Sequence, residues 1–227
     1  MYDPILNTWK KNALPWAKTV ENGDLPSRQL GTDQAICSAI ENAAPKAVLD
    51  MGCGEGWLCR ALAAKGYQVL GVDGAPGLIE RAKAKGGARY VCTSFDAFPQ
   101  YLKLDVGVQA DVAVFNFSLF DGDNPTLQLL QAVRTVLPPG GQLFIQTIHP
   151  GYPVDGESGA DRWITENWSG MKETFEGSYR WYFRSLESWQ ALILKAGFHR
   201  FNAQPVALPG QAQPISAILS AYVGERP

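Results

Sequence analysis

The sequence predicts an α/β domain built on a mostly parallel sheet. Strand-like and helix-like segments alternate from Ala47 onward, with glycine-rich turns between them. Strands that alternate with single helices favour parallel pairing and helices on both faces of the sheet. The last two strand candidates are separated only by the loop Pro209 to Pro214. Because parallel neighbours need a crossover of about a dozen residues, these two strands are predicted to be antiparallel.

Size and composition agree with one domain, residues 1–227. The chain is 46% hydrophobic and 19% charged, with a formal net charge of −2. This near-neutral charge predicts no nucleic-acid partner, and no run reaches the roughly 18 apolar residues of a membrane span. The cysteines fit neither a zinc knuckle nor a disulfide framework, so we expect no metal and a cytoplasmic location. These cysteines are Cys37, Cys53, Cys59 and Cys92. We expect a monomer or a homodimer.

Residues 1–44 are predicted to form helices that cap the sheet. Trp9 and Trp16 share one helical face, and Pro15 predicts either a kink or the start of a second helix. Thr32 is the expected N-cap of the helix that follows.

Residues 45–149 are predicted to form the cofactor-binding core. One helix ends at Gly66, one begins at Pro76, and one follows Asn124 and Pro125. The apolar runs between them predict five strands at residues 46–51, 67–73, 88–93, 110–117 and 142–148.

The rhythm changes after the fifth strand. Residues 150–184 are rich in Gly, Pro, Trp and Tyr and show no clear period. A loop of this length usually carries a function, and we interpret it as a lid over a substrate. Residues 185–227 return to the alternation, with a helix capped by Ser185 and strands at residues 198–208 and 215–224.

The stretch "VLDMGCGEGW" carries the main candidate site. Asp50 ends the first strand, Gly52 and Gly54 follow, and Asp73 ends the second strand. Glycines in this place let the backbone approach a ligand, and an acidic residue at this distance accepts hydrogen bonds from ribose hydroxyls. The spacing matches neither the dinucleotide motif nor a P-loop. Asp50 and Glu55 would repel a pyrophosphate, and they suit a ligand that carries an ammonium or sulfonium charge.

Five motifs together resemble the class I S-adenosylmethionine-dependent methyltransferases, in the small-molecule branch of the type 11/12 kind. They are "VLDMGCGEG", "GVDGAPGLIERA", "ADVAVFNFSLF", "LPPGGQLFIQTIHP" and "LESWQALILKAGF". The resemblance covers roughly residues 45 to 223. It implies a Rossmann-like sheet of seven strands with an antiparallel last strand, S-adenosylmethionine as cofactor and S-adenosylhomocysteine as product.

The resemblance also implies roles for individual residues. The residues expected to hold the methionine half of the cofactor are Arg28, Asp50, Gly52, Cys53, Gly54, Asn116 and Phe117. Those expected at the ribose and adenine are Asp73, Gly74, Ser94 and Phe95. The family usually places an acidic residue where this chain has Ser94, and Asp96 follows two positions later.

His149 directly follows the fifth strand and is the candidate general base, because imidazole accepts protons near neutral pH. The alternative is a structural histidine, since many relatives use no base. His199 lies at the opposite end of the sheet and is interpreted as structural.

Aromatic residues of the lid and of the first helix are the candidate substrate contacts. Arg184 is a candidate partner for a substrate carboxylate or phosphate, with a surface ion pair as the alternative. The rings could also pack at the edge of the core or at a dimer contact. The candidates are Trp9, Trp163, Trp168, Tyr182 and Arg184.

The sequence therefore predicts an enzyme that methylates a small, apolar or aromatic acceptor on oxygen or nitrogen. Aminopropyl transfer from a decarboxylated cofactor stays open as one alternative. A cofactor-binding scaffold subunit without catalysis is the other. The glycine spacing argues against an NAD-dependent oxidoreductase.

Overall fold

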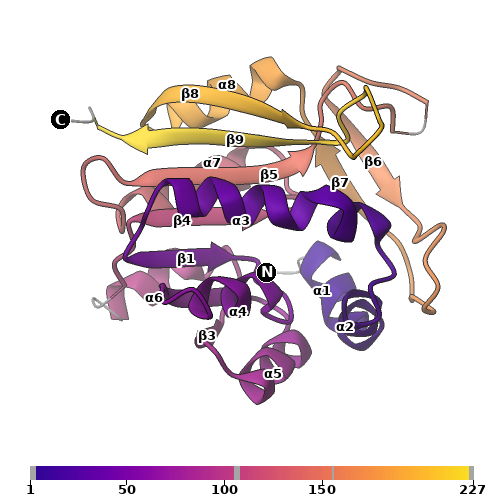
Figure 1. The fold of residues 1–227 in the computed structure, drawn as a ribbon, viewed down its shortest axis with the longest axis horizontal. Coiled ribbons are helices and arrows are strands. Elements are labelled where there is room, and N and C mark those ends of the chain that lie inside the picture. The colour runs from indigo at the N-terminus through magenta and orange to yellow at the C-terminus, as the bar shows by residue number, and fades with distance from the viewer. Residues whose placement is uncertain (1–3, 105–107, 155, 225–227) are drawn as a thin grey trace.

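The computed structural model describes residues 4–104, 108–154 and 156–224, and these residues confirm the predicted α/β class (Figure 1). They form one sheet of seven strands and a separate pair of strands. The strands of the large sheet are β1 (Ala47–Met51), β2 (Gln68–Asp73), β3 (Arg89–Cys92), β4 (Val112–Asn116), β5 (Gln142–Ile148), β8 (Phe198–Val206) and β9 (Ser216–Val223). The separate pair is β6 (Arg162–Glu166) and β7 (Tyr179–Phe183).

The topology of the large sheet determines where a ligand binds. The strand order is β3-β2-β1-β4-β5-β9-β8. β1 pairs in parallel with both β2 and β4, whereas β9 runs antiparallel to both β5 and β8. The antiparallel ending predicted from the short final loop is therefore confirmed. The strand order changes direction between β1 and β4, and open α/β sheets bind ligands beyond the carboxyl ends of such strands.

Helices cover both faces of the sheet. On one face, α3, α4 and α5 bury residues such as Ile36 and Leu62 against the strands. On the other face, α6, α7 and α8 bury residues such as Phe98 and Trp189. The helical elements are α1 (Pro4–Lys11), α2 (Ala13–Glu21), η1 (Arg28–Thr32), α3 (Asp33–Asn42), α4 (Trp57–Ala63), α5 (Pro76–Lys85), α6 (Phe98–Leu104), α7 (Asp123–Arg134) and α8 (Leu186–Lys195).

The first two helices lie beyond the carboxyl ends of the parallel strands, on the side where β6 and β7 also lie (Figure 1). They are separate helices, because the chain breaks between them at Asn12. Pro15 therefore lies near the start of a second helix and does not kink the first. The buried Asn12 side chain ties this break to residues 150–184. Its Nδ2 donates to the carbonyl of Glu176 at 2.9 Å, and its Oδ1 accepts from the Glu176 N–H at 2.8 Å.

Three local features differ from expectation. Helix α6 was not predicted, because Pro99 interrupts its short pattern. The β6–β7 hairpin was not predicted either, because glycine-rich loops surround its two five-residue strands. The N-cap assignment of Thr32 was wrong: its backbone is already helical, and its hydroxyl donates to the carbonyl of Ser27 at 3.2 Å.

Candidate active site

A cavity of about 620 Å³ opens at the carboxyl ends of the parallel strands. Its walls come from α1 and α2, from the loops that follow β1, β2, β3 and β4, from the end of β5, and from the β6–β7 hairpin. The size is within the usual range of about 300 to 1,000 Å³ for small-molecule sites. The cavity therefore lies at the reversal of strand order between β1 and β4.

The glycine-rich loop forms the floor of this cavity. Gly52 and Gly54 have φ angles of +77° and +58°, which L side chains rarely adopt. A Cβ atom on Gly52 would lie only 2.3 Å from the Cβ of Ser118, so this glycine is required for packing. A Cβ atom on Gly54 would have Nε1 of Trp16 as its nearest neighbour, at 3.8 Å. Gly54 thus leaves open a space that a side chain would fill.

Asp73 holds the glycine-rich loop in place from the end of β2. One carboxylate oxygen accepts the N–H of Gly54 at 2.9 Å, and the other accepts the N–H of Ala75 at 2.8 Å. Burial raises the pKa of Asp73. Each carboxylate oxygen has a second lone pair, which a ribose hydroxyl can use. Asp73 therefore lines the cavity in the position that the sequence predicts.

Asp50 does not line the cavity, which corrects the prediction that it contacts the ligand directly. It is 1% exposed beneath the loop, where one oxygen accepts from the Cys59 thiol at 3.1 Å and the other has no partner. Burial raises the pKa of Asp50 to about 7. The physical reason is the strand: Asp50 still belongs to β1, and the cavity begins at the loop that follows. Cys53, in that loop, does line the cavity.

The loop after β3 brings Ser94, Phe95 and Asp96 to the cavity wall. The Ser94 hydroxyl donates to the Asp96 carboxylate, so the two side chains act as one polar unit. An acidic side chain thus lies two residues after Ser94 on the same wall. Gly74 lines the same region, and a Cβ atom there would approach Leu6 to 2.6 Å.

The end of β4 supplies a further part of the wall. Asn116 and Phe117 both line the cavity, and Oδ1 of Asn116 is buried without a hydrogen-bond partner. Phe117 has a positive φ of +50°, an uncommon conformation for this residue. Ser118 then fixes the turn by donating to the carbonyl of Met51 at 2.7 Å.

Arg28 lines the cavity from η1. Its Nε lies 3.0 Å from Asp33, and its guanidinium lies 4.6 Å from the centre of the Trp57 ring. The side chain is therefore oriented before any ligand binds, and one carboxylate already balances its charge.

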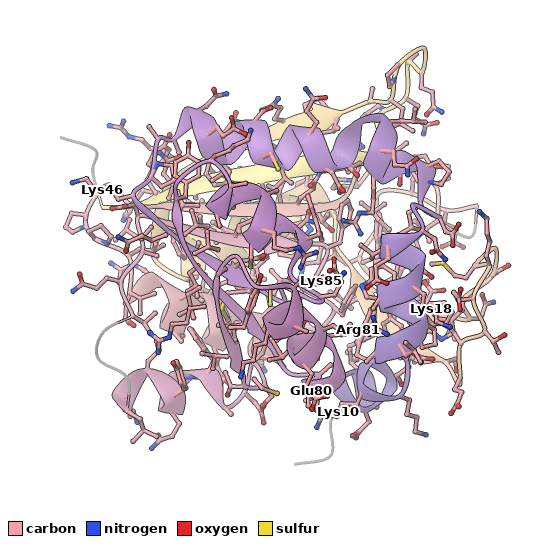
Figure 2. The ribbon with its side chains drawn as sticks, turned by 60° about the horizontal axis from the view of Figure 1, so that its bottom comes forward. Lys10, Lys18, Lys46, Glu80, Arg81 and Lys85 are labelled. Atoms are coloured by element: carbon pink, nitrogen blue, oxygen red, sulfur yellow. The ribbon has the colours of Figure 1, made fainter. Side chains whose placement is uncertain are left out.

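Ion pairs fasten α2 to the rest of the site. On α5, Arg81 and Lys85 lie next to α2 (Figure 2). Glu21 of α2 pairs with Arg81 at 3.2 Å and with Lys85 at 2.8 Å, and Lys85 also reaches Glu55 of the glycine-rich loop at 3.2 Å. Helix α2, which carries the cavity residue Trp16, is thereby held against the loop.

Aromatic rings from α1, the β4–α7 loop and the hairpin line another part of the cavity. The Trp9 ring stacks on Phe120 at 5.8 Å, meets Trp168 edge-on at 5.5 Å and lies 5.9 Å from Tyr179. All four residues line the cavity, and so does Trp181. Of the predicted substrate contacts, Trp9 and Trp168 are therefore at the cavity.

The other predicted substrate contacts lie outside the cavity lining. Trp163 is 44% exposed and packs against Tyr182, its partner across the hairpin. Arg184 is 2% exposed and pairs with Asp123 at 3.2 Å. It therefore forms an ion pair, but a buried one and not the surface pair of the alternative. Side chains alternate along a strand, so the face of β7 that carries Tyr179 and Trp181 to the cavity turns Tyr182 away.

His149 also lies outside the cavity lining, which argues against its role as general base. Its Nδ1 accepts the N–H of Gly151 at 3.0 Å, and burial lowers its pKa. The strand β5 ends at Ile148, and the chain turns away immediately after it. His149 is thus a turn residue, as its structural alternative proposed.

Several cavity residues were missed from the sequence. The alternation in "YRWYF" was a usable signal for Tyr179 and Trp181, and the acidic composition of the predicted lid was one for Glu166, whereas Gln146 gave none. The residues in question are Trp16, Phe120, Gln146, Glu166, Tyr179 and Trp181. Among the described residues there is no cluster of His, Cys, Asp and Glu suited to a metal, and no described helix is long and apolar enough to span a membrane.

The fold and the cavity together define a Rossmann-like α/β protein with a ligand site at its switch point. A solved S-adenosylmethionine-dependent methyltransferase from Mesorhizobium loti matches 82% of this chain and 96% of its own, with a TM-score of 0.58 and 20% identity. The glycopeptide N-methyltransferase MtfA, solved with sinefungin, matches 86% of this chain and 87% of its own, with a TM-score of 0.65 and 15% identity. The predicted fold is confirmed.

A family model described as a methyltransferase domain matches residues 28–200. The chain therefore belongs to this methyltransferase family, as its motifs predicted. It is also 29% identical over 121 residues to the ubiquinone biosynthesis O-methyltransferase of Brucella ovis. That match covers 51% of this chain and 48% of the relative, so the chain spans about half the length of the curated relatives it matches.

Proposed function

We propose that this protein transfers a methyl group from S-adenosylmethionine to a small acceptor, with S-adenosylhomocysteine as the second product. Membership of the methyltransferase family supports the reaction. The observation that carries the proposal is the joint placement of the open Gly54 backbone and the Asp73 carboxylate on one cavity wall. An acceptor of ribose hydroxyls and a floor without side chains are what a nucleoside ligand requires.

The residues of the loop side fit this cofactor. Asp73 would bind the ribose, the Ser94–Asp96 pair would bind the adenine amino group, and Arg28 would bind the methionine carboxylate. The buried Asp50 adds negative charge beneath the loop, and a positive sulfonium above it would favour its ionised form. We include Gly52, Cys53, Gly74, Phe95, Asn116 and Phe117 in the proposed cofactor site.

Bound in this place, the cofactor supplies an electrophilic methyl group. The chain itself then has to align the acceptor and keep water away, which is worth several orders of magnitude in rate. The rings of Trp9, Trp168, Tyr179 and Trp181 perform both tasks in this proposal. No described histidine lines the cavity, so the proposed mechanism assigns no proton transfer to a histidine.

We further propose that residues 150–184 act as a lid within a single domain. The hairpin of this segment carries the aromatic wall, and the two Asn12 hydrogen bonds to Glu176 link it to the junction of α1 and α2. Opening the lid would therefore involve the N-terminal helices as well.

Calorimetric titration with S-adenosylmethionine, S-adenosylhomocysteine, the decarboxylated cofactor and NAD tests the proposal. We expect micromolar binding of the first two only. Asp73→Ala removes charge-assisted hydrogen bonds worth about 1.5 to 3 kcal/mol, so affinity should fall at least about tenfold. Asp73→Asn keeps one acceptor for the loop and is the second variant, in case Asp73→Ala does not fold. Glu80→Gln, on the exposed side of α5, is the control. Binding of NAD, or unchanged affinity in both Asp73 variants, would contradict the proposal.

A further inference from the structure

The part of the cavity away from the glycine-rich loop has a defined chemistry. We call it the acceptor half, formed by Trp9, Phe120, Glu166, Trp168, Tyr179 and Trp181. The electron-rich rings of Trp9, Phe120, Trp168 and Tyr179 all line this half, with centroid separations of 5.4 to 5.9 Å. Trp168 also stacks on Phe175 at 4.4 Å. Electron-rich faces of this kind attract a cation within about 6 Å of a ring.

Glu166 places a carboxylate beside these rings. Its Oε1 accepts the N–H of Trp168 at 2.8 Å. Glu166 lies directly opposite Tyr179 in the register of the β6–β7 hairpin. None of the ion pairs formed by the described lysines and arginines involves Glu166. Its negative charge is therefore available to a ligand in the acceptor half.

The whole cavity is poor in positive charge. Of the described residues that line it, Arg28 is the only lysine or arginine, and Asp33 already pairs with it. Five carboxylates line the same space: Glu55, Asp73, Asp96, Asp121 and Glu166. Ion pairs with Arg60 and Lys85 balance the charge of Glu55, which leaves four. An anionic acceptor would meet repulsion there, whereas a cationic one would be attracted.

A buried acceptor atom points to a hydrogen-bond donor on the ligand. Gln146 lines the cavity and is only 1% exposed. Its Nε2 donates to the carbonyl of Thr32 at 3.1 Å, and a carbonyl accepts only, so the orientation of the amide is determined. The remaining Oε1 of Gln146 has no partner. Neither has Oδ1 of Asn116, its register partner on β4, which belongs to the proposed cofactor site. Buried acceptors without partners are unfavourable, and a ligand N–H would satisfy them.

We propose that the methyl acceptor is an amine, which enters the acceptor half as an ammonium ion against the aromatic rings and Glu166. This inference rests on the proposed function and names its substrate class. The indole N–H of Trp9 is a buried donor without a partner, and it suits an oxygen or nitrogen elsewhere on the same acceptor.

Methyl transfer to the amine requires a free nitrogen lone pair. The bound ammonium first releases one proton to water, which frees the nitrogen lone pair. That lone pair forms the new N–C bond to the methyl carbon while the C–S bond breaks, and its electron pair stays on sulfur. The products are an N-methylated ammonium ion and a neutral thioether.

Three compounds of matched shape test the proposal: 2-phenylethylamine, 2-phenylethanol and 3-phenylpropanoate. Each is titrated calorimetrically into the protein saturated with S-adenosylhomocysteine, so that the cofactor part of the cavity is filled. We expect the amine to bind about tenfold more tightly than the alcohol, from one cation–π contact and one carboxylate, and the propanoate to bind most weakly.

Glu166→Gln is the matched variant, because its amide oxygen can still accept the Trp168 N–H. We expect the preference for the amine to fall to about twofold in this variant, whereas S-adenosylhomocysteine binds as before. Glu187→Gln, exposed on α8, is the control and should keep the full preference.

The outcomes separate the two proposals. The amine inference would be overturned if the alcohol or the propanoate bound at least as tightly as the amine. It would also be overturned if the amine did not bind. An undiminished preference in Glu166→Gln would overturn it as well. If S-adenosylhomocysteine bound in these experiments, the proposed function would stand without the amine. If it did not bind, both proposals would be rejected.

Discussion

Asp50 makes the stability of this protein depend on pH in a predictable direction. Its pKa rises from an ordinary value of 3.8 to about 7, because burial beneath the glycine-rich loop removes its hydration. A carboxyl group with a raised pKa binds more protons in the folded state than in the unfolded state. Stability from this group is therefore complete below about pH 4 and is lost as the pH rises toward 7.

The size of the effect follows from the two pKa values. The two pKa values differ by about three, and each pKa unit corresponds to about 1.36 kcal/mol. The free energy of unfolding therefore falls by about 4 kcal/mol between pH 4 and pH 8. Asp50→Asn keeps the shape of the side chain and removes its charge. We expect the free energy of unfolding of Asp50→Asn, relative to the unmodified protein, to increase by about 2 to 4 kcal/mol over this range.

Urea unfolding at pH 4.5, 6 and 8, followed by tryptophan fluorescence, measures this difference. A constant offset from repacking of the amide does not matter, because only the change with pH is compared. Asp96→Asn is the control, because it makes the same change at an exposed carboxylate. Parallel pH profiles for Asp50→Asn and the unmodified protein would refute the reasoning.

Two further predictions concern residues with packing roles. Gly52→Ala should lower the free energy of unfolding by about 2 to 4 kcal/mol, because its Cβ would lie 2.3 Å from Ser118 at a φ of +77°. Urea unfolding measures this loss. A loss below about 0.5 kcal/mol would contradict the prediction. Arg184→Met should lose about 1 to 3 kcal/mol, since it removes bonds to Asp121 and Thr126. If Arg184→Met were as stable as the unmodified protein and bound 3-phenylpropanoate more weakly, Arg184 would instead be a substrate contact.

The sequence was most informative where the physics is local. Alternating strands and helices predicted the parallel sheet, and a six-residue loop predicted the antiparallel final pair. Glycines after one strand and Asp73 after the next predicted the loop side of the cavity. These features could be recognised because turn chemistry and strand length depend on residues close together in the chain.

The acceptor side could not be predicted in the same way. Period-two alternation places Tyr179 and Trp181 on one face of β7 and Tyr182 on the other, but it does not say which face meets the cavity. Strand β7 pairs only with β6, outside the main sheet, so tertiary packing against α1 decides the direction. The same holds for His149, whose chain turns away at the end of β5.

The sequence by itself determined the fold class, the glycine-rich loop and the position of Asp73, since each depends on neighbouring residues. Only the tertiary structure decided the burial of Asp50 and the placing of Glu166 and Gln146 at the cavity. The environment of these side chains is built by segments far apart in the chain. Gln146, for example, is oriented by the carbonyl of Thr32, which lies 114 positions earlier.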